Sequence, residues 1–382
     1  MNNQAFLDTA HRIGRSLCRD AIWSGPVCNW LGWAARHVGT QLVIGKGSQN
    51  AAFGQGTAGI ALFLARLHSI TADPLIKITG LGALQHAIHN ADTRNFDFFT
   101  GCTGTLYAAV ELDALLHAGE FRTHACQGLK RAMDAGTAAG DGMPARLAGS
   151  ILALIAIHRR HQFKCALEFA AQLGEALAST VTARKQHTEA AQAAMEGSAL
   201  LELAAETGHG DFRPAGEQAL DSVRRTGQEK AFWPSDHLPG FPELYTQTMP
   251  LSFLHAQAGR AAGLAPGHAD ALQYALTVAE ATTTSLTRPL LPGDGGYCLA
   301  HGVAGKAEVL ALAANHGQRK QLSDTAVAAA QTGIIHFAEK KMPWPCAIPA
   351  NGESPNLMFG LAGIGYFYLR LYDPAGIPSL LV

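Results

Sequence analysis

The sequence predicts an all-α protein whose helical hairpins close into a ring. Three observations support this fold class: a recurring turn, its spacing, and two alternating kinds of helix. A small-residue turn, often Gly-x-x-Gly, opens an apolar stretch at seven places along the chain. The last residues of these turns are Gly59, Gly104, Gly149, Leu200, Gly259, Gly305 and Gly363, which follow one another at intervals of 45 to 59 residues. Such a period is typical of one helix-turn-helix unit per repeat, so seven turns predict seven hairpins.

The two kinds of helix differ in their apolar pattern. Residues 60–67 and 150–157 are apolar with little polar periodicity, and a helix that is apolar all round is buried. Residues 163–184 are amphipathic, which is typical of a helix with one solvated face. No linker, low-complexity tract or charge block divides the chain. We therefore expect a single domain, residues 1–382, folded as an α/α toroid with seven inner and seven outer helices.

The composition excludes several classes of partner. Hydrophobic residues make up 48% of the chain, which is enough for a large core. Lys and Arg number 29 against 30 Asp and Glu, so we expect neither a nucleic-acid partner nor an anionic membrane surface. The polar start lacks the apolar region of a signal peptide, and the seven cysteines lack a disulfide-like spacing. We expect a cytoplasmic protein with reduced thiols.

The glycine turns have a packing interpretation and a functional one. Glycine lets two segments approach closely, and this alone would explain a tight ring of helices. If the inner helices are parallel, however, their N-termini gather at one mouth of the ring. Free backbone N–H groups and helix dipoles would then favour an anion there. The mouth is where we expect chemistry.

Four features resemble the lanthionine synthetase C-like family: the repeated turns, Trp30–Leu31–Gly32 with Trp233–Pro234, the segment His301–Gly302–Val303–Ala304–Gly305, and the ending GLAGIGYFYLRLYDPAGIPSLL. The likeness is greatest to the cyclase domain of class II lanthipeptide synthetases and runs from about residue 6 to residue 381. It implies the same toroid. It also implies a zinc site of two cysteines and one histidine, which activates a peptide thiol for addition to a dehydroamino acid.

The chain departs from that family at the metal ligands. The two cysteine positions hold Leu254 and Ala300, and only the histidine position is kept, as His301. The resemblance therefore implies no metal and no other cofactor. One alternative is that Cys298, His255 and His301 rebuild a site, since catalytic zinc needs three protein ligands. The other interpretation of Cys298 is a small buried hydrophobe.

Five residues are candidates for catalysis. His301 would act as a general base or hydrogen-bond donor at a helix start, and Glu196 occupies the position of a family acid/base histidine. His255, Asp141 and Arg146 are further candidates around the mouth. Each has a structural interpretation as well: His301 as a helix cap, and Glu196 as a partner of the helix dipole.

Two functions remain open. The sequence favours a zinc-independent cyclase or conjugating enzyme, in which a base takes the nucleophile's proton and N–H dipoles stabilise the enolate of a dehydrated ribosomal peptide. Family members fused to a kinase-like domain lack the cysteines and are still credited with cyclisation. The alternative is a catalytically inactive scaffold that binds a peptide or partner in a maturation complex. The expected partners are a modified precursor peptide and a separate dehydratase or kinase/lyase.

Overall fold

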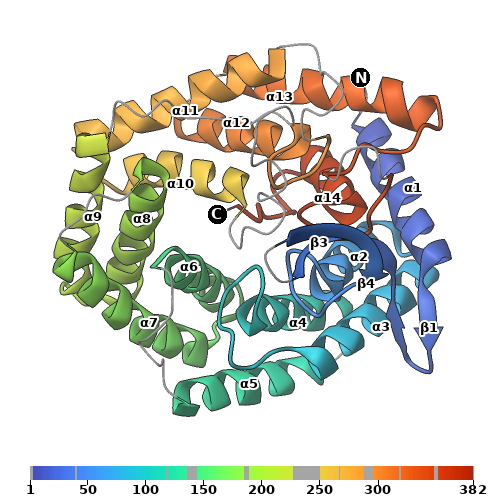
Figure 1. Ribbon diagram of the computed structural model, residues 1–382, viewed down its shortest axis with the longest axis horizontal. Helices are drawn as coiled ribbons and strands as arrows, with labels where there is room; N and C mark the ends of the chain where they lie inside the picture. The colour runs from blue at the N-terminus through green and yellow to red at the C-terminus, as the bar shows by residue number, and fades with distance from the viewer. Residues whose placement is uncertain are drawn as a thin grey trace.

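Fourteen α-helices form two concentric layers of a ring in the part of the chain that the structure describes (Figure 1). The computed structural model describes residues 3–38, 41–117, 119–135, 144–184, 189–226, 250–265, 267–287, 296–317, 320–347 and 352–381. The inner helices are α2 (Thr57–Thr71), α4 (Cys102–Leu116), α6 (Pro144–His161), α8 (Ala190–Thr207), α10 (Leu251–Leu264), α12 (Val303–Gly317) and α14 (Leu361–Tyr372). The outer helices are α1 (Gln4–Asp20), α3 (Pro74–Asn90), α5 (Phe121–Ala135), α7 (Lys164–Ala183), α9 (Phe212–Thr226), α11 (Ala269–Thr287) and α13 (Lys320–Gly333), which continues into a π-helical segment (Ile334–Glu339). The predicted all-α toroid is confirmed.

The two layers follow the apolar patterns of the sequence. In α2 every residue from Thr57 to Leu67 is buried, as expected of an inner helix. In α7 the buried residues recur at helical spacing, from Ala166 through Phe169, Leu173 and Leu177 to Val181. An outer helix thus buries one stripe against its inner partner and leaves the opposite face to solvent.

The turn between α2 and α3 illustrates how hairpin geometry is fixed locally. Pro74 occupies the first turn of α3, where its missing N–H costs no hydrogen bond, and the side chain of Asp73 accepts from the backbone N–H of Leu75. Asp73 also pairs with Arg15 and His11 of α1. One carboxylate therefore caps α3 and fastens α1 against the first hairpin.

Two antiparallel β-hairpins between α1 and α2 add to the predicted helices. Strand β1 (Ile22–Ser24) pairs with β2 (Val27–Asn29), and β3 (Leu31–Val38) pairs with β4 (Gln41–Ser48). Trp30 lies between the hairpins, is buried, and donates from its indole Nε1 to the carbonyl of Leu17 in α1. The hydroxyl of Ser354 donates to the carbonyl of Trp33, so the second hairpin contacts the turn before α14.

Beyond α14 the chain turns back to the centre of the ring, where Figure 1 marks the C-terminal end. Arg370 donates to the carbonyl of Pro374, Tyr366 to that of Pro378, and Gln257 of α10 to that of Leu381. Residues 373–381 therefore join α14 to α10 across the interior. None of the helices in the described ranges is long and apolar enough to span a bilayer.

Candidate functional site

The mouth of the ring is the end at which α2, α4, α12 and α14 begin, and four turns of one design lead into these helices. In each turn, the first backbone N–H of the helix donates to a carbonyl seven residues earlier. The pairs are Thr57 to Asn50 (2.9 Å), Cys102 to Asn95 (2.8 Å), Val303 to Gly296 (3.0 Å) and Leu361 to Ser354 (2.7 Å). Because each turn uses this N–H internally, fewer free donors face the mouth than the sequence led us to expect.

Glycine is required at these turns by close backbone approach. A Cβ at Gly104 would lie 2.0 Å from the carbonyl oxygen of Phe98, and one at Gly305 would lie 2.0 Å from that of Leu299. Gly59 and Gly363 show the same contact with the residue six positions earlier. The packing interpretation of the repeated glycines is therefore sufficient for these four turns.

A chain of main-chain hydrogen bonds joins neighbouring turns around the mouth. Gly54 donates to Phe99 (2.8 Å), Met358 to Gly54 (2.8 Å), Ala300 to Met358 (2.8 Å), and Ser252 of α10 to Ala300 (2.9 Å). Gly54, Phe99, Ala300 and Met358 all stand three residues before their helices. The bonds link the starts of five inner helices, α4, α2, α14, α12 and α10, without using a side chain.

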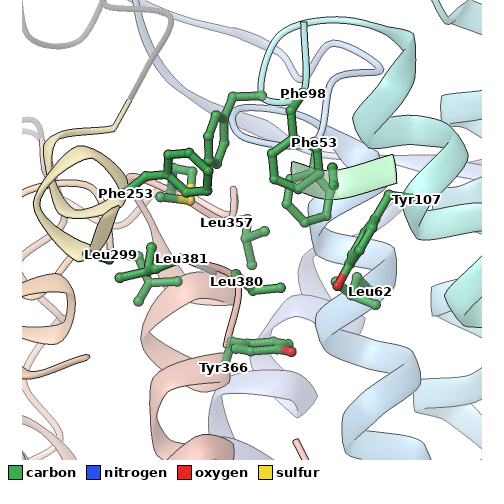
Figure 2. Close-up of a cluster of buried hydrophobic side chains, with 14 of the residues drawn as sticks. Phe53, Leu62, Phe98, Tyr107, Phe253, Leu299, Leu357, Tyr366, Leu380 and Leu381 are labelled. Atoms are coloured by element: carbon green, nitrogen blue, oxygen red, sulfur yellow. The ribbon is translucent and has the colours of Figure 1, made fainter. Parts of the chain in front are cut away.

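Beneath this chain of bonds lies a layer of apolar side chains. Phe53, Phe98, Leu299 and Leu357 each stand four residues before an inner helix, and all four are buried. Figure 2 shows them gathered with Phe253, Leu380 and Leu381 in the interior, with Tyr107 at one side and Tyr366 below. The rings of Phe53 and Phe98 have centroids 4.8 Å apart. The part of the mouth that these residues form is an apolar plug.

His301 lies two residues before α12, at the edge of this plug. Its ring centroid is 6.0 Å from that of Phe359, and the residue is 2% exposed. Burial, with a smaller effect from the charge of Lys306, lowers the pKa of His301 to about 3. The imidazole is therefore neutral at physiological pH and only weakly basic.

Glu196 lies within a helix and not just ahead of one, contrary to the sequence-based expectation, and His255 also lies within a helix. His255 is the fifth residue of α10 and Glu196 the seventh of α8. Burial lowers the pKa of His255 to about 4. Both oxygens of Glu196 accept hydrogen bonds from Arg184, at 2.7 and 2.9 Å, and Gln192 adds a third at 2.8 Å. Glu196 thus forms a buried ion pair that ties the end of α7 to α8.

Of the remaining predicted residues, the structure describes Arg146 but not Asp141. Arg146 is the third residue of α6, and its charge acts on Asp97 in the turn before α4. Asp141 and the Trp233–Pro234 pair lie outside the described residues. The structure therefore brings His301 and Ala300 together at the mouth, whereas Glu196 points into an ion pair between α7 and α8. No observation tests a catalytic role for any of the five candidates, and these roles stay predictions.

The zinc of the family does not fit the residues present. Leu254 and Ala300 have no donor atom, and Leu254 lies in the second turn of α10. Cys298 is fully buried, and its sulfur accepts the backbone N–H of His301. Among the described residues, no group of three or more His, Cys, Asp or Glu is arranged to hold a metal ion. The proposed Cys298–His255–His301 site is therefore not assembled.

The role of Cys298 follows from the register of the turns. Asp97, Cys298 and Asn356 each stand five residues before an inner helix. The side-chain oxygens of Asp97 and Asn356 accept the backbone N–H three residues later, at 2.6 and 2.9 Å. Cys298 occupies the same position, and the backbone N–H groups of residues 300–302, that of His301 among them, are directed at its sulfur. It is a turn-forming acceptor, an option that neither interpretation of the sequence had included.

Asp97 is a candidate that sequence reasoning missed. Oδ1 of Asp97 accepts two bonds from Thr100, but no hydrogen bond reaches its buried Oδ2 or the Nε of Arg146 from the described residues. Burial raises the pKa of Asp97 despite the opposing effects of Thr100 and Arg146. Its register with Asn356 was a usable signal, since both fall five residues before the start of a glycine-opened helix.

A second set of missed residues forms a belt of ion pairs that joins the inner helices from α2 to α10 and, separately, α12 to α14. Its members are Arg66 of α2, Glu111 of α4, Arg159 and Arg160 of α6, Glu202 of α8, Arg260 of α10, Glu308 of α12 and Arg370 of α14. The sign of the charge alternates from each inner helix to the next. The single carboxylate of Glu111 pairs with Arg66, Arg160 and His161. Most of the charged groups of the belt thus form ion pairs with one another.

Comparison with known proteins gives one family and several distant folds. Solved structures that match include a glycosyl hydrolase of family 88 from Bacteroides vulgatus (10% identity, TM-score 0.45, 85% of this chain and 100% of that one) and a polysaccharide lyase (10%, 0.47, 98% and 97%). A family 76 mannosidase from Bacteroides thetaiotaomicron matches at 11% identity and a TM-score of 0.43, over 82% of this chain and 100% of that one. No curated protein sequence matches. Residues 268–382, which carry α11 to α14, match the model of the lanthionine synthetase C-like protein family.

Proposed function

We propose that this chain is a lanthionine synthetase C-like protein that binds a dehydroamino-acid-containing ribosomal peptide, or a partner that carries one, and does not itself catalyse thioether closure. The observation that supports this is the composition of the mouth. Apolar side chains stand at two of the three metal-ligand positions, and the kept histidine is buried against Phe359. What remains of the family's activity is recognition of the peptide.

The energetics of thiol activation favour binding over catalysis. A peptide thiol has a pKa near 8.5 and needs a metal or a base to become a nucleophile. Transfer of its proton to an imidazole whose pKa is about 3 costs roughly 7 kcal/mol before any bond forms. Glu196 offers no better base, because Arg184 and Gln192 already occupy its oxygens. Zinc would remove this cost, but the donor set does not fit it.

A second candidate function is zinc-independent ring closure with His301 as the base. The observation that favours it is that His301 keeps its place two residues before α12 and is neutral at physiological pH, the protonation state that a base needs. This function requires that the bound peptide raise the basicity of the imidazole against the effect of burial. The two functions differ in whether the protein raises the rate of ring closure, which can be measured.

The test is mass spectrometry with thiol alkylation on a peptide that carries one dehydroalanine and one cysteine. Ring closure protects the cysteine from alkylation, so the protected fraction over time gives the rate. We expect the same rate of ring closure with and without the protein. Fluorescence anisotropy should show that the protein binds the labelled peptide, and elemental analysis should find no stoichiometric zinc.

Acceleration in the absence of metal would contradict the binding function. Loss of that acceleration in His301→Ala, but not in the exposed control His209→Ala, would establish the second candidate. One zinc per chain, with acceleration that a chelator removes, would contradict both functions and restore the metal-dependent mechanism.

A further inference from the structure

The outer layer holds a pair of cysteines that the mouth does not use. Cys126 of α5 and Cys165 of α7 lie with their sulfur atoms 3.6 Å apart, and both are partly exposed. The other five cysteines are buried. We infer that Cys126 and Cys165 form a dithiol that peroxides oxidise to a reversible disulfide.

The surroundings hold the two thiols in place. Arg122, one turn before Cys126, donates to the carbonyl of His161 and lies over the ring of Phe163, with 5.3 Å from its guanidinium carbon to the ring centroid. Phe163 immediately precedes α7, two residues before Cys165. The start of α5 is therefore docked on the turn between α6 and α7. Because the helices are already held together, closing the bond to about 2.05 Å needs only a small movement.

The chemistry balances with hydrogen peroxide as the oxidant. One cysteine, as thiolate, attacks a peroxide oxygen and becomes a sulfenic acid, with release of water. The second sulfur attacks the sulfenic sulfur, displaces a second water and forms the S–S bond. Two thiols lose two electrons, and one peroxide is reduced to two waters.

The short distance between the two sulfur atoms determines that a disulfide forms, and the acidity of the thiols determines the rate of the first oxidation step. Burial, reinforced by the adjacent Cys126 thiol, raises the pKa of Cys165 to about 12, so Cys165 is protonated at neutral pH and the first step is slow. Once a sulfenic acid has formed, the neighbouring sulfur at 3.6 Å is its nearest reaction partner. The cross-link would enclose residues 126–165, which include all of α6, the helix that carries Arg146 near its start.

The experiment is peptide mapping of the full-length protein after mild treatment with hydrogen peroxide and alkylation of the remaining thiols. We expect a cross-linked peptide pair that contains Cys126 and Cys165, lacks two hydrogens and disappears after reduction. The oxidised protein should unfold at a temperature several degrees higher than the reduced one, because the cross-link constrains the unfolded chain.

Matched variants separate this pair from general oxidation. Cys126→Ser and Cys165→Ser should each lose both the cross-linked peptide and the gain in unfolding temperature. Cys102→Ser, at a buried cysteine of α4, should keep both. The inference is overturned if peroxide drives Cys126 and Cys165 separately to sulfinic acids, or if both stay free to alkylation while other cysteines cross-link.

Discussion

The mouth turns and the ion-pair belt are two regions of the inner layer that are held together by opposite means. The turns are joined by main-chain hydrogen bonds and by glycines in close contact with carbonyl oxygens. The belt is joined by charged side chains, several of them almost wholly buried. Side chains at the mouth, such as that of Ala300, are therefore replaceable without loss of the ring.

The belt has a constraint that follows from the number of helices. Seven is odd, so charges that alternate around a closed ring must bring two like charges together at one seam. Here the seam is that of α14 and α2, which carry Arg370 and Arg66. Arg370 pairs with Glu308 on its other side and donates to the carbonyls of Pro374 and Ile377. The segment after α14 therefore supplies backbone oxygens where the alternation fails.

The largest effect is expected in the belt, from Glu111→Gln. Burial would raise the pKa of Glu111, but His161, Arg160 and Arg66 together hold it below its usual value. Removal of this charge leaves the buried Arg66 and the partly exposed Arg160 without their carboxylate. We expect the free energy of unfolding, measured in urea, to fall by about 3–5 kcal/mol. The control is Glu217→Gln in the exposed Arg213–Glu217 pair, which should change it by less than about 1 kcal/mol.

If Glu111→Gln proves no more costly than Glu217→Gln, the belt is not what holds the inner helices together. The contrast between the two regions would then have to rest on the mouth turns alone.

A smaller effect is expected from two buried histidines, His301 at the mouth and His255 within α10. The pKa values of His301 and His255, about 3 and about 4, lie below the unfolded value near 6.5. The unfolded chain therefore binds more protons below pH 6.5, and stability is lost as the pH falls toward the folded pKa values. Each histidine should cost about 2 kcal/mol between pH 7 and pH 5.

Urea unfolding at several pH values is the measurement, and the slope against pH is the readout. His301→Gln should reduce the slope by about one proton, even if it also lowers stability at pH 7. His209→Gln, at an exposed position, should leave the slope unchanged. An unaltered slope in His301→Gln would mean that this imidazole is not desolvated, and the argument against its role as a base would fail.

The sequence was sufficient for the ring and for the four glycine-opened turns. It did not predict where α8 and α10 begin. No glycine precedes Gly259 in α10, which begins at Leu251, so the helix runs through the expected turn and includes Leu254 and His255. The alanine-rich run from Ala190 does the same for Glu196 in α8, since alanine is the strongest helix former. The resemblance gave the positions of the candidates but not their local structure.

Pairing between distant residues was the other limit. Glu196 meets Arg184, and Glu111 meets Arg66 and Arg160, only because the hairpins stack around a ring. No periodicity in the sequence marks such partners. The two β-hairpins did leave a signal, the Ser24–Gly25–Pro26 turn with Gly25 at a φ of 59°, but the repeat pattern drew the interpretation toward helices alone.

The smallest effects concern two glycines that the repeat pattern treats as equivalent. Gly305 is the third residue of α12, and a Cβ there would lie 2.0 Å from the carbonyl oxygen of Leu299, whereas a Cβ at Gly259 in α10 would meet no other atom of the described residues within 4 Å beyond the backbone of its own helix. Gly305→Ala should destabilise the protein by about 1–3 kcal/mol, the usual cost of overpacking. Gly259→Ala should stabilise it by about 0.5–1 kcal/mol, because alanine suits a helix interior better than glycine. Urea unfolding of both variants measures the difference directly. If the two variants change the free energy of unfolding in opposite directions, only the turn at Gly305 requires its glycine. The fifth repeat then lacks the turn geometry that the mouth turns share. Equal destabilisation would mean that the turn before α10 persists, and that Leu254 and His255 face the mouth after all.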